Sequence, residues 1–210
     1  MPSYFSKTSR LGRVNTGSVA QRLADTPGVA RTILDAARAA RGMAGADPRA
    51  MSHSWLFTGP PGSGRSLAAL DFAAALMCTD PEEPGCGRCE ACQAVLGAKQ
   101  HTDLVLVDPQ EVIIPVDTVR EVIGRAASLP TVAPWRVVIF NNADRLTNNG
   151  ANALLKTVEE PPARTVIIMC APSDAPEDFS QTLRSRCRHL YIPSPSVESI
   201  TAQLVSEGAS

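Results

Sequence analysis

The sequence predicts an α/β protein built on a parallel sheet that helices cover on both faces. Segments typical of strands alternate with segments typical of helices along most of the 210 residues, which is the pattern of strands joined by crossover helices. The strand segments Val137–Phe140 and Thr165–Cys170 are almost entirely apolar, as expected when both faces of a sheet are buried. Hydrophobic residues make up 44% of the chain, enough for a sizeable core.

The apolar periodicity locates the individual elements. We expect strands at residues 55–58, 103–107, 136–140, 165–170 and 189–192. We expect helices at residues 19–41, with a break at 26–28, and then at 64–77, 117–126, 151–160 and 179–186. The third of these helices has Asp117 as its expected N-cap. The fourth ends before Pro161 because proline cannot continue a helix.

The same patterns divide the chain into three parts. Residues 1–17 are polar and are expected to form a disordered leader. Residues 18–195 are expected to form the α/β domain, with a cysteine-rich insertion at residues 78–92. Residues 196–210 contain one amphipathic stretch, which we interpret as the start of a further helix.

A glycine-rich loop, Gly59–Ser66, joins the first expected strand to its helix. Strand, glycine-rich loop and helix in this order are the layout of a phosphate-binding loop, in which backbone N–H groups surround an anion. The candidate phosphate-binding residues are Gly59, Gly62, Ser63, Gly64, Arg65 and Ser66. Arg65 stands where the motif has lysine and carries a bulkier planar cation, so the loop is degenerate. A tight strand-to-helix turn without a ligand is the alternative.

The strand at residues 136–140 ends in Asn141-Asn142, where a nucleotide hydrolase of this type carries acidic residues. An amide binds magnesium weakly and cannot accept a proton from water, so magnesium is not expected here. Asp144 is either a displaced magnesium ligand or a turn residue, and we favour the turn. Together with Arg65, these residues predict little or no intrinsic ATPase activity.

Four of the six cysteines, Cys78, Cys86, Cys89 and Cys92, lie within fifteen residues. Two successive C-x2-C spacings let one loop wrap a tetrahedral metal ion, and four thiolates leave no open position for catalysis. The sequence therefore predicts a structural site. Zinc is favoured over an iron–sulfur cluster because nothing else in the sequence indicates redox chemistry.

Composition and charge exclude several other classes of protein. No segment approaches the roughly 20 continuous apolar residues of a membrane span. The first residues include Lys7, Arg10 and Arg13 but no apolar run, so they do not form a secretory signal. The net charge of -1 gives no overall attraction to nucleic acid or to anionic membranes. We therefore expect a cytoplasmic protein.

Three arginines lie in the segment Leu183–Arg188, immediately before the fifth expected strand. One interpretation is a solvated basic turn at the end of a helix, which the helix dipole favours. The other is an arginine finger offered in trans to a phosphate bound by a neighbouring subunit. The spacing alone favours the solvated turn.

As a set, these motifs resemble the AAA+ clamp-loader subunits of bacterial replication. The features that carry the resemblance are the loop Gly59–Ser66, the four-cysteine insertion after its helix, the segment Ala151–Pro162, and Ser185-Arg186-Cys187. Together they span about residues 52–193. The degraded catalytic positions are similar to those of the delta-prime subunits of the DNA polymerase III holoenzyme, in their actinobacterial form.

The resemblance implies a five-stranded parallel sheet of the AAA+ P-loop NTPase type, with the first strand central and an inserted four-cysteine zinc module. It implies a stator subunit, without hydrolysis of its own, in a ring that loads the sliding clamp onto primed DNA during replication. The implied partners are the tau/gamma and delta subunits, the clamp, and primed DNA through the complex, without a membrane. By position, Arg186 would then be the arginine finger that completes a neighbour's ATP site.

Several questions stay open at this point. Binding of ATP or ADP by the degenerate loop is one of them. The family's helical lid and collar would follow residue 210, so residues 196–210 would begin a truncated lid. An alternative is an ATP-hydrolysing motor subunit of the tau/gamma type. Another is a zinc-containing nucleic-acid binder that uses Arg88, Lys99 and His101, although no aromatic residues accompany them.

Overall fold

The sheet observed in the computed structural model, which describes residues 17–109 and 112–195, has five strands in the order β2-β3-β4-β1-β5. The strands are β1 Ser54–Thr58, β2 Leu104–Val107, β3 Arg136–Phe140, β4 Thr165–Ala171 and β5 Arg188–Tyr191. Every neighbouring pair is parallel. The predicted α/β class and all five strands are therefore confirmed to within a residue or two.

The position of β1 differs in one detail from the sequence-based expectation. β1 lies inside the sheet, between β4 and β5, but the middle position belongs to β4. All seven residues of β4 are buried, because strands flank it on both sides and helices cover both faces. The expectation that the first strand is central is therefore wrong, although β1 is an interior strand.

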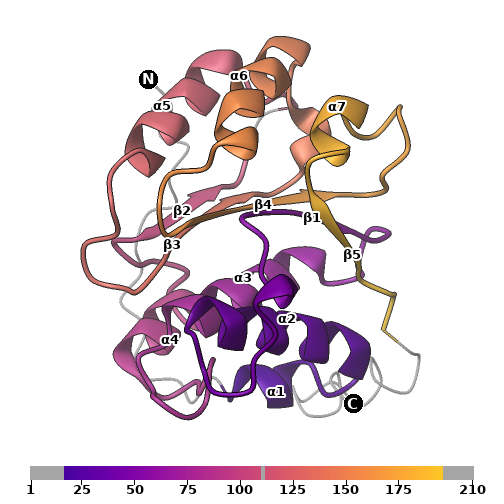
Figure 1. Cartoon of the computed structure of the whole chain (residues 1–210). Coiled ribbons are helices and arrows are strands. Elements are labelled where there is room, and N and C mark those ends of the chain that lie inside the picture. The colour runs from indigo at the N-terminus through magenta and orange to yellow at the C-terminus, as the bar shows by residue number, and fades with distance from the viewer. Residues whose placement is uncertain (1–16, 110–111, 196–210) are drawn as a thin grey trace.

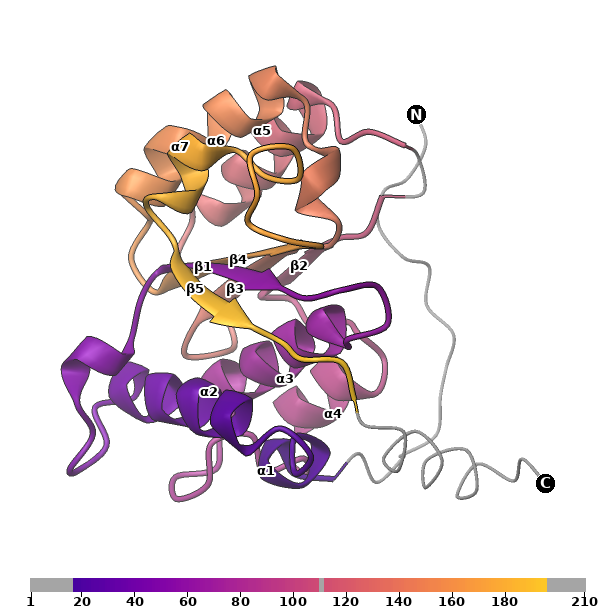
Figure 2. The ribbon, with the colours of Figure 1, turned by 90° about the vertical axis from the view of Figure 1, so that its right-hand side faces the viewer.

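Helices cover both faces of the sheet (Figures 1 and 2). On one face lie α1 Val19–Arg22, α2 Pro27–Ala40, α3 Arg65–Met77 and α4 Glu90–Leu96, of which α3 packs most closely on the strands. The other face packs against α5 Val116–Ala126, α6 Asn148–Glu159 and α7 Gln181–Arg184. Two short 3-10 helices, η1 Pro48–Ala50 and η2 Ala143–Arg145, precede β1 and follow β3.

The sheet separates two apolar clusters because side chains alternate along each strand. Trp55 and Phe57 of β1 point toward α1–α4, whereas Leu56 between them belongs to the cluster under α5–α7. Trp55 packs edge-on against Phe72 of α3, with 5.0 Å between the ring centroids. Aromatic packing among Trp55, Phe57 and Phe72 thus ties the first strand to the helix that follows the glycine-rich loop.

Helix boundaries differ from the sequence-based expectation where capping residues decide them. Pro115, not Asp117, is the N-cap of α5, so that prediction is wrong; Asp117 lies in the first turn and pairs with Arg120. α6 starts three residues earlier than expected because the Thr147 hydroxyl accepts the N–H of Gly150 at 3.1 Å. α7 is shorter than expected and ends in a turn that contains Arg186.

The predictions of a disordered leader and of a further C-terminal helix concern residues 1–16 and 196–210, which lie outside the described residues. Every helix in the described part of the chain is too short or too polar to cross a membrane.

A buried ion pair fixes the loop between α5 and β3. The carboxylate of Asp103 accepts backbone N–H groups of Thr131, Val132 and Ala133 at 2.8–2.9 Å. It also accepts a bond from Arg136 at 3.0 Å. Burial acts to raise the pKa of Asp103, but these hydrogen bonds outweigh it and hold the pKa far below its ordinary value. The carboxylate is therefore a fixed structural anion.

Replacing Asp103 by alanine should lower the free energy of unfolding by about 3–5 kcal/mol, since it leaves the charge of Arg136 buried without its acidic partner. Because the folded pKa lies below the unfolded one, the stabilisation is present above about pH 4 and is lost as the pH falls toward the folded pKa. Urea unfolding at several pH values measures both effects. Asp117→Asn, whose side chain is 86% exposed, should change stability by less than about 0.5 kcal/mol; equal losses in the two variants would contradict the prediction.

Candidate functional site

The glycine-rich loop forms a tight turn between β1 and α3 in which specific glycines are required. Gly62 and Gly64 have φ values of 84° and 81°, a left-handed conformation that glycine adopts without steric cost. Gly59 is required for a different reason: a Cβ there would lie 2.4 Å from the carbonyl oxygen of Ile192. The loop leads directly into α3, with Gly64 as N-cap. The predicted strand–loop–helix layout is thus present.

The side chain of Arg65 turns back onto its own loop. Its Nη1 donates to the carbonyl oxygens of Gly59 at 2.9 Å and Pro60 at 3.2 Å, and Nη2 donates to Asn142 Oδ1 at 3.4 Å. Ser66 follows at the second position of α3 and is half-buried. The cation at the lysine position is therefore engaged with acceptors of this chain.

The end of β3 faces the loop with neutral groups. The Arg65–Asn142 contact brings this strand end to the loop, and Asn142 has a left-handed backbone with φ of 52°. Asn141 is buried, and its Oδ1 has no hydrogen-bond partner among the described residues. Asp144 is exposed on η2. No carboxylate within the described contacts replaces the acid that magnesium would require.

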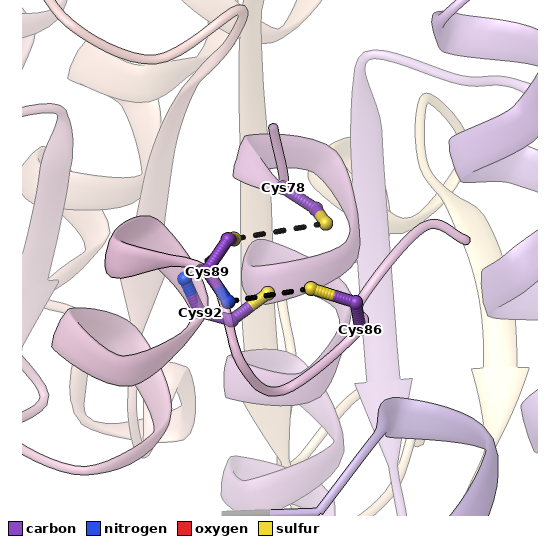
Figure 3. A group of neighbouring side chains, drawn as sticks. All are labelled: Cys78, Cys86, Cys89 and Cys92. Carbon is purple, nitrogen blue, oxygen red and sulfur yellow. Dashed lines mark hydrogen bonds between the residues drawn. The ribbon is translucent and has the colours of Figure 1, made fainter. Parts of the chain in front are cut away.

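The structure brings the four clustered cysteines together (Figure 3). Cys78 caps the end of α3, Cys89 is the N-cap of α4, and Cys92 lies in the first turn of α4. The four Sγ atoms all lie within 4.8 Å of one another, and Sγ of Cys78 and Cys89 are 3.8 Å apart. A tetrahedral ion with bonds of about 2.3 Å to sulfur requires separations of about 3.8 Å. The cluster therefore has the size of a four-thiolate metal site.

Backbone N–H groups already point at these sulfur atoms. Cys89 N–H donates to Cys86 Sγ, and Cys92 N–H donates to Cys89 Sγ, each at 3.4 Å. The hydrogen bond between the Cys92 and Cys78 thiols lowers the pKa of Cys78 and raises that of Cys92, while burial raises the pKa of Cys86. Thiolate is the form of cysteine that binds metals. Because the four sulfur atoms already lie within 4.8 Å of one another, the cysteines could hold a metal ion without rearrangement of the fold.

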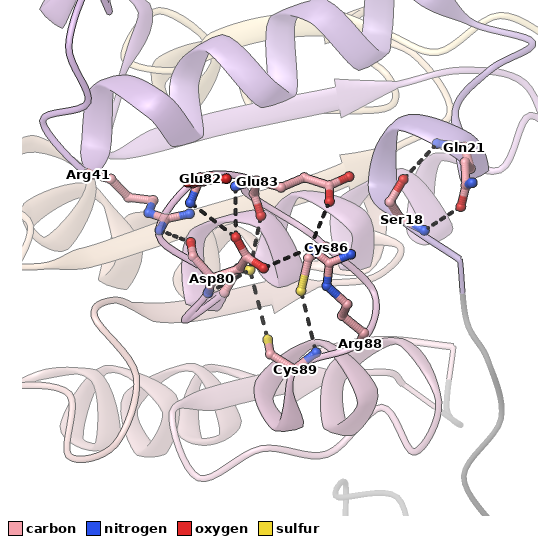
Figure 4. Close-up of polar contacts among 10 residues, drawn as sticks. Ser18, Gln21, Arg41, Asp80, Glu82, Glu83, Cys86, Arg88 and Cys89 are labelled. Atoms are coloured by element: carbon pink, nitrogen blue, oxygen red, sulfur yellow. Dashed lines mark hydrogen bonds and ion pairs between the residues drawn. The ribbon is translucent and has the colours of Figure 1, made fainter.

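Polar contacts hold the insertion in shape around the cysteines (Figure 4). Asp80 accepts the N–H groups of Glu82 and Glu83 at 3.1 and 3.0 Å and pairs with Arg88 at 3.0 Å. The bond from Glu83 N–H and then that from Arg88 lower the pKa of Asp80 to about 2. Arg88 also pairs with Glu83, so this member of the expected basic patch is neutralised by acidic neighbours.

The insertion also contacts the first helix. The N–H of Val19 donates to the carbonyl of Gly85 at 2.8 Å. A Cβ on Gly85 would lie 2.4 Å from Val19 Cγ2, and one on Gly87 would lie 1.9 Å from the carbonyl oxygen of Gly17. Both glycines have positive φ values. Nothing in the sequence indicated this contact, because it joins segments more than sixty residues apart.

Arg186 lies in the turn between α7 and β5, with its side chain 36% exposed. Its Nε donates to Glu159 Oε1 at 2.5 Å, and its Nη1 donates to the carbonyl oxygen of Thr182 at 2.9 Å. The neighbouring Arg184 pairs instead with Asp174. The contact with Glu159 was not predicted, because it depends on how α6 packs beside α7.

The glycine-rich loop and Arg186 lie at opposite ends of the sheet. The loop follows the carboxyl end of β1, whereas Arg186 precedes the amino end of β5. The register pairs Trp55 with Arg188 and Thr58 with Tyr191. Each residue advances a parallel strand by about 3.3 Å, so the backbones of the two sites are separated by the length of the strands.

These features define an α/β protein of the P-loop NTPase type that carries a four-cysteine insertion. The chain belongs to the family described as DNA polymerase III, delta subunit, which it matches over residues 44–196. The match includes the loop, the insertion and the arginine turn.

Among similar proteins, DNA polymerase III subunit delta' of Pseudomonas aeruginosa is 37% identical over 147 residues, which are 69% of this chain and 44% of that protein. The corresponding subunit of Escherichia coli is 35% identical over 153 residues, covering 71% and 45%. DNA polymerase III subunit gamma/tau of Mycobacterium tuberculosis is 37% identical over 145 residues, covering 68% and 25%. The chain therefore spans less than half the length of these relatives.

A solved structure of a DNA polymerase III gamma subunit-related protein from Thermotoga maritima superposes with a TM-score of 0.55 at 23% identity. The similarity covers 73% of this chain and 44% of that one. It shows a shared fold.

Freshly purified, reduced protein should contain one metal ion per chain, and Cys89→Ser should lose it and unfold at a lower temperature. Serine is a much poorer ligand than thiolate, and three cysteines leave the tetrahedral shell incomplete. Elemental analysis and thermal unfolding measure these outcomes. Cys187→Ser is the matched control, because burial raises the pKa of Cys187 to about 12 and it lies outside the cluster. Metal-free wild-type protein would rule out the site.

Proposed function

We propose that this chain is the AAA+ domain of a delta-prime clamp-loader subunit of the DNA polymerase III holoenzyme. In this role it acts as a stator, which does not hydrolyse ATP but presents Arg186 to the ATP site of an adjacent subunit. The family and the relatives named delta' support the proposal. Its partners would be the tau/gamma and delta subunits, the sliding clamp, and primed DNA through the complex, and its location would be the cytoplasm.

The observation that carries the stator role is the contact between Arg65 and Asn142. In a hydrolase, the group at the end of this strand is an acid that holds magnesium and polarises water. Here an amide oxygen accepts a hydrogen bond from the arginine that replaces the loop lysine. Neither group supplies a proton acceptor or an anionic metal ligand. The geometry therefore supports a loop that is unable to carry out rapid hydrolysis, and among the described residues no carboxylate contacts Arg65 or Asn142.

The placement of Arg186 supports action in trans. Because it precedes β5 while the loop follows β1, Arg186 stands at the far end of the parallel strands from its own loop. It is exposed and lies on a short turn beside α6 and α7. An arginine that stabilises a phosphate from this position serves another subunit.

The proposed metal is a structural zinc ion held by Cys78, Cys86, Cys89 and Cys92. Four sulfur ligands of this spacing suit zinc and leave no position for a substrate. The ion would join the ends of α3 and α4 and so hold the insertion that contacts α1. The residues Gly59, Gly62, Ser63, Gly64, Arg65 and Ser66 would form a degenerate phosphate loop, in which binding of ATP or ADP is compatible with the backbone but opposed by the contacts of Arg65.

The purified chain should hydrolyse ATP more slowly than about 0.1 per second, far below typical enzyme rates, and Arg65→Ala should leave that background unchanged. A steady-state phosphate-release assay in the presence of magnesium measures both. Faster turnover that disappears in Arg65→Ala would identify a motor subunit and end the stator proposal.

Arg186→Ala should reduce hydrolysis at the neighbouring ATP site by about a thousandfold, the effect of losing an arginine finger. The measurement is single-turnover ATP hydrolysis in a reconstituted ring, with far-UV circular dichroism to verify the fold. Arg184→Ala is the control, because Arg184 is exposed on the same segment but pairs with Asp174. Normal hydrolysis with Arg186→Ala would refute the assignment.

A further inference from the structure

The guanidinium group of Arg186 is held along one side by its own chain. Glu159 Oε1 receives the Nε–H at 2.5 Å. The carbonyl oxygen of Thr182 and the hydroxyl of Ser185 lie 2.9 and 3.2 Å from Nη1. Nη2 has no hydrogen-bond acceptor among the described residues. A guanidinium has five N–H donors in a fixed plane, so the bonds to Nε and Nη1 also fix the direction of the free Nη2 donors.

The location of Glu159 indicates that its role is tied to this arginine. Glu159 is the last residue of α6, and an anion is unfavourable near the carboxyl end of a helix. The positive charge of Arg186 offsets that repulsion. The next residue, Glu160, has the same charge and is exposed. No hydrogen bond or ion pair joins its side chain to another described residue, which makes Glu160 a matched reference.

The Arg186–Glu159 pair is independent of the other two arginines of this segment, Arg184 and Arg188, because these have other partners. Asp174 pairs with Arg184 at 2.5 Å and lies 4.0 Å from His189. Arg188 donates to the carbonyl oxygens of Arg49 and Ala50. Each of the three arginines of the segment therefore has its own acceptors, and Glu159 is the acidic partner of Arg186.

We propose that Glu159 is a positioning residue that holds the Arg186 guanidinium with its Nη2 edge directed toward the phosphate of a neighbouring subunit. The proposal rests on the proposed arginine-finger function. A guanidinium group that is already oriented loses less conformational freedom when it binds a phosphate. Glu159 acts on Arg186 alone and does not contact the nucleotide.

The first test uses the chain by itself. In ¹H–¹⁵N spectra, the Arg186 Nε–H should give a signal protected from exchange with water, identified by its absence in Arg186→Lys. Glu159→Gln should shift this signal and speed its exchange, whereas Glu160→Gln should leave it unchanged. If Glu159→Gln leaves the signal as in the wild type, Glu159 does not hold the guanidinium and the proposal is overturned.

The second test uses the reconstituted ring and single-turnover hydrolysis. Glu159→Gln should slow hydrolysis at the neighbouring site by about twofold to fivefold, the range expected for a partly exposed ion pair. Glu160→Gln should have no effect, and Glu159→Gln should add nothing in an Arg186→Ala background. Faster hydrolysis with Glu159→Gln would mean that Glu159 holds Arg186 away from the phosphate. An equal loss of hydrolysis in Glu159→Gln and Glu160→Gln would mean a general charge effect. Either result overturns the proposal.

The two hypotheses fail in distinguishable ways. If Arg186→Ala slows hydrolysis at the neighbouring ATP site while Glu159→Gln behaves as the wild type, the arginine-finger function is supported and the positioning role is refuted. If Arg186→Ala has no effect on the ring, the finger function fails and the positioning role fails with it, even where the spectra report the ion pair. Thermal unfolding of Glu159→Gln verifies that altered hydrolysis does not reflect an altered fold.

Discussion

The parallel direction of β1 and β5 is the constraint on which the arrangement of this chain depends. The two strands pair side by side and run in the same direction. The segment that follows β1 therefore lies at the carboxyl ends of the strands, and the segment that precedes β5 lies at their amino ends. The glycine-rich loop lies at the carboxyl ends of the strands, and Arg186 lies at the amino ends. Arg186 is therefore separated from the glycine-rich loop of its own chain by the length of the strands, and the proposed finger would act on a second subunit.

The glycine-rich loop combines a backbone suited to a phosphate-binding loop with side chains that differ from those of the motif. Its glycines keep the left-handed conformations and the close approach to Ile192 that the turn needs. The cation at Arg65 is engaged by the carbonyl oxygens of its own loop and by the amide of Asn142. The backbone geometry of the loop depends on its glycines, whereas its side-chain chemistry depends on Arg65 and Asn142. The two are therefore separable.

The cysteine cluster connects otherwise separate parts of the structure. Cys78 ends the helix that begins at the phosphate loop, and Cys89 and Cys92 open α4. The loop between them contacts α1 through Gly85 and Val19. Binding energy of a structural ion becomes folding energy where ligands come from several elements. The proposed zinc ion would thus order the first helix as well as the insertion.

Local patterns in the sequence predicted the α/β class, the five strands, the glycine-rich loop and the grouping of four cysteines, because each depends on residues that are close together in the chain. They did not determine the central position of β4, the N-cap of α5, or the partners of Arg65 and Arg186. Asn142 lies 77 residues from Arg65, and Glu159 lies 27 residues from Arg186. Such contacts arise only when packing brings distant segments together, and local patterns of polarity and spacing carry no information about them.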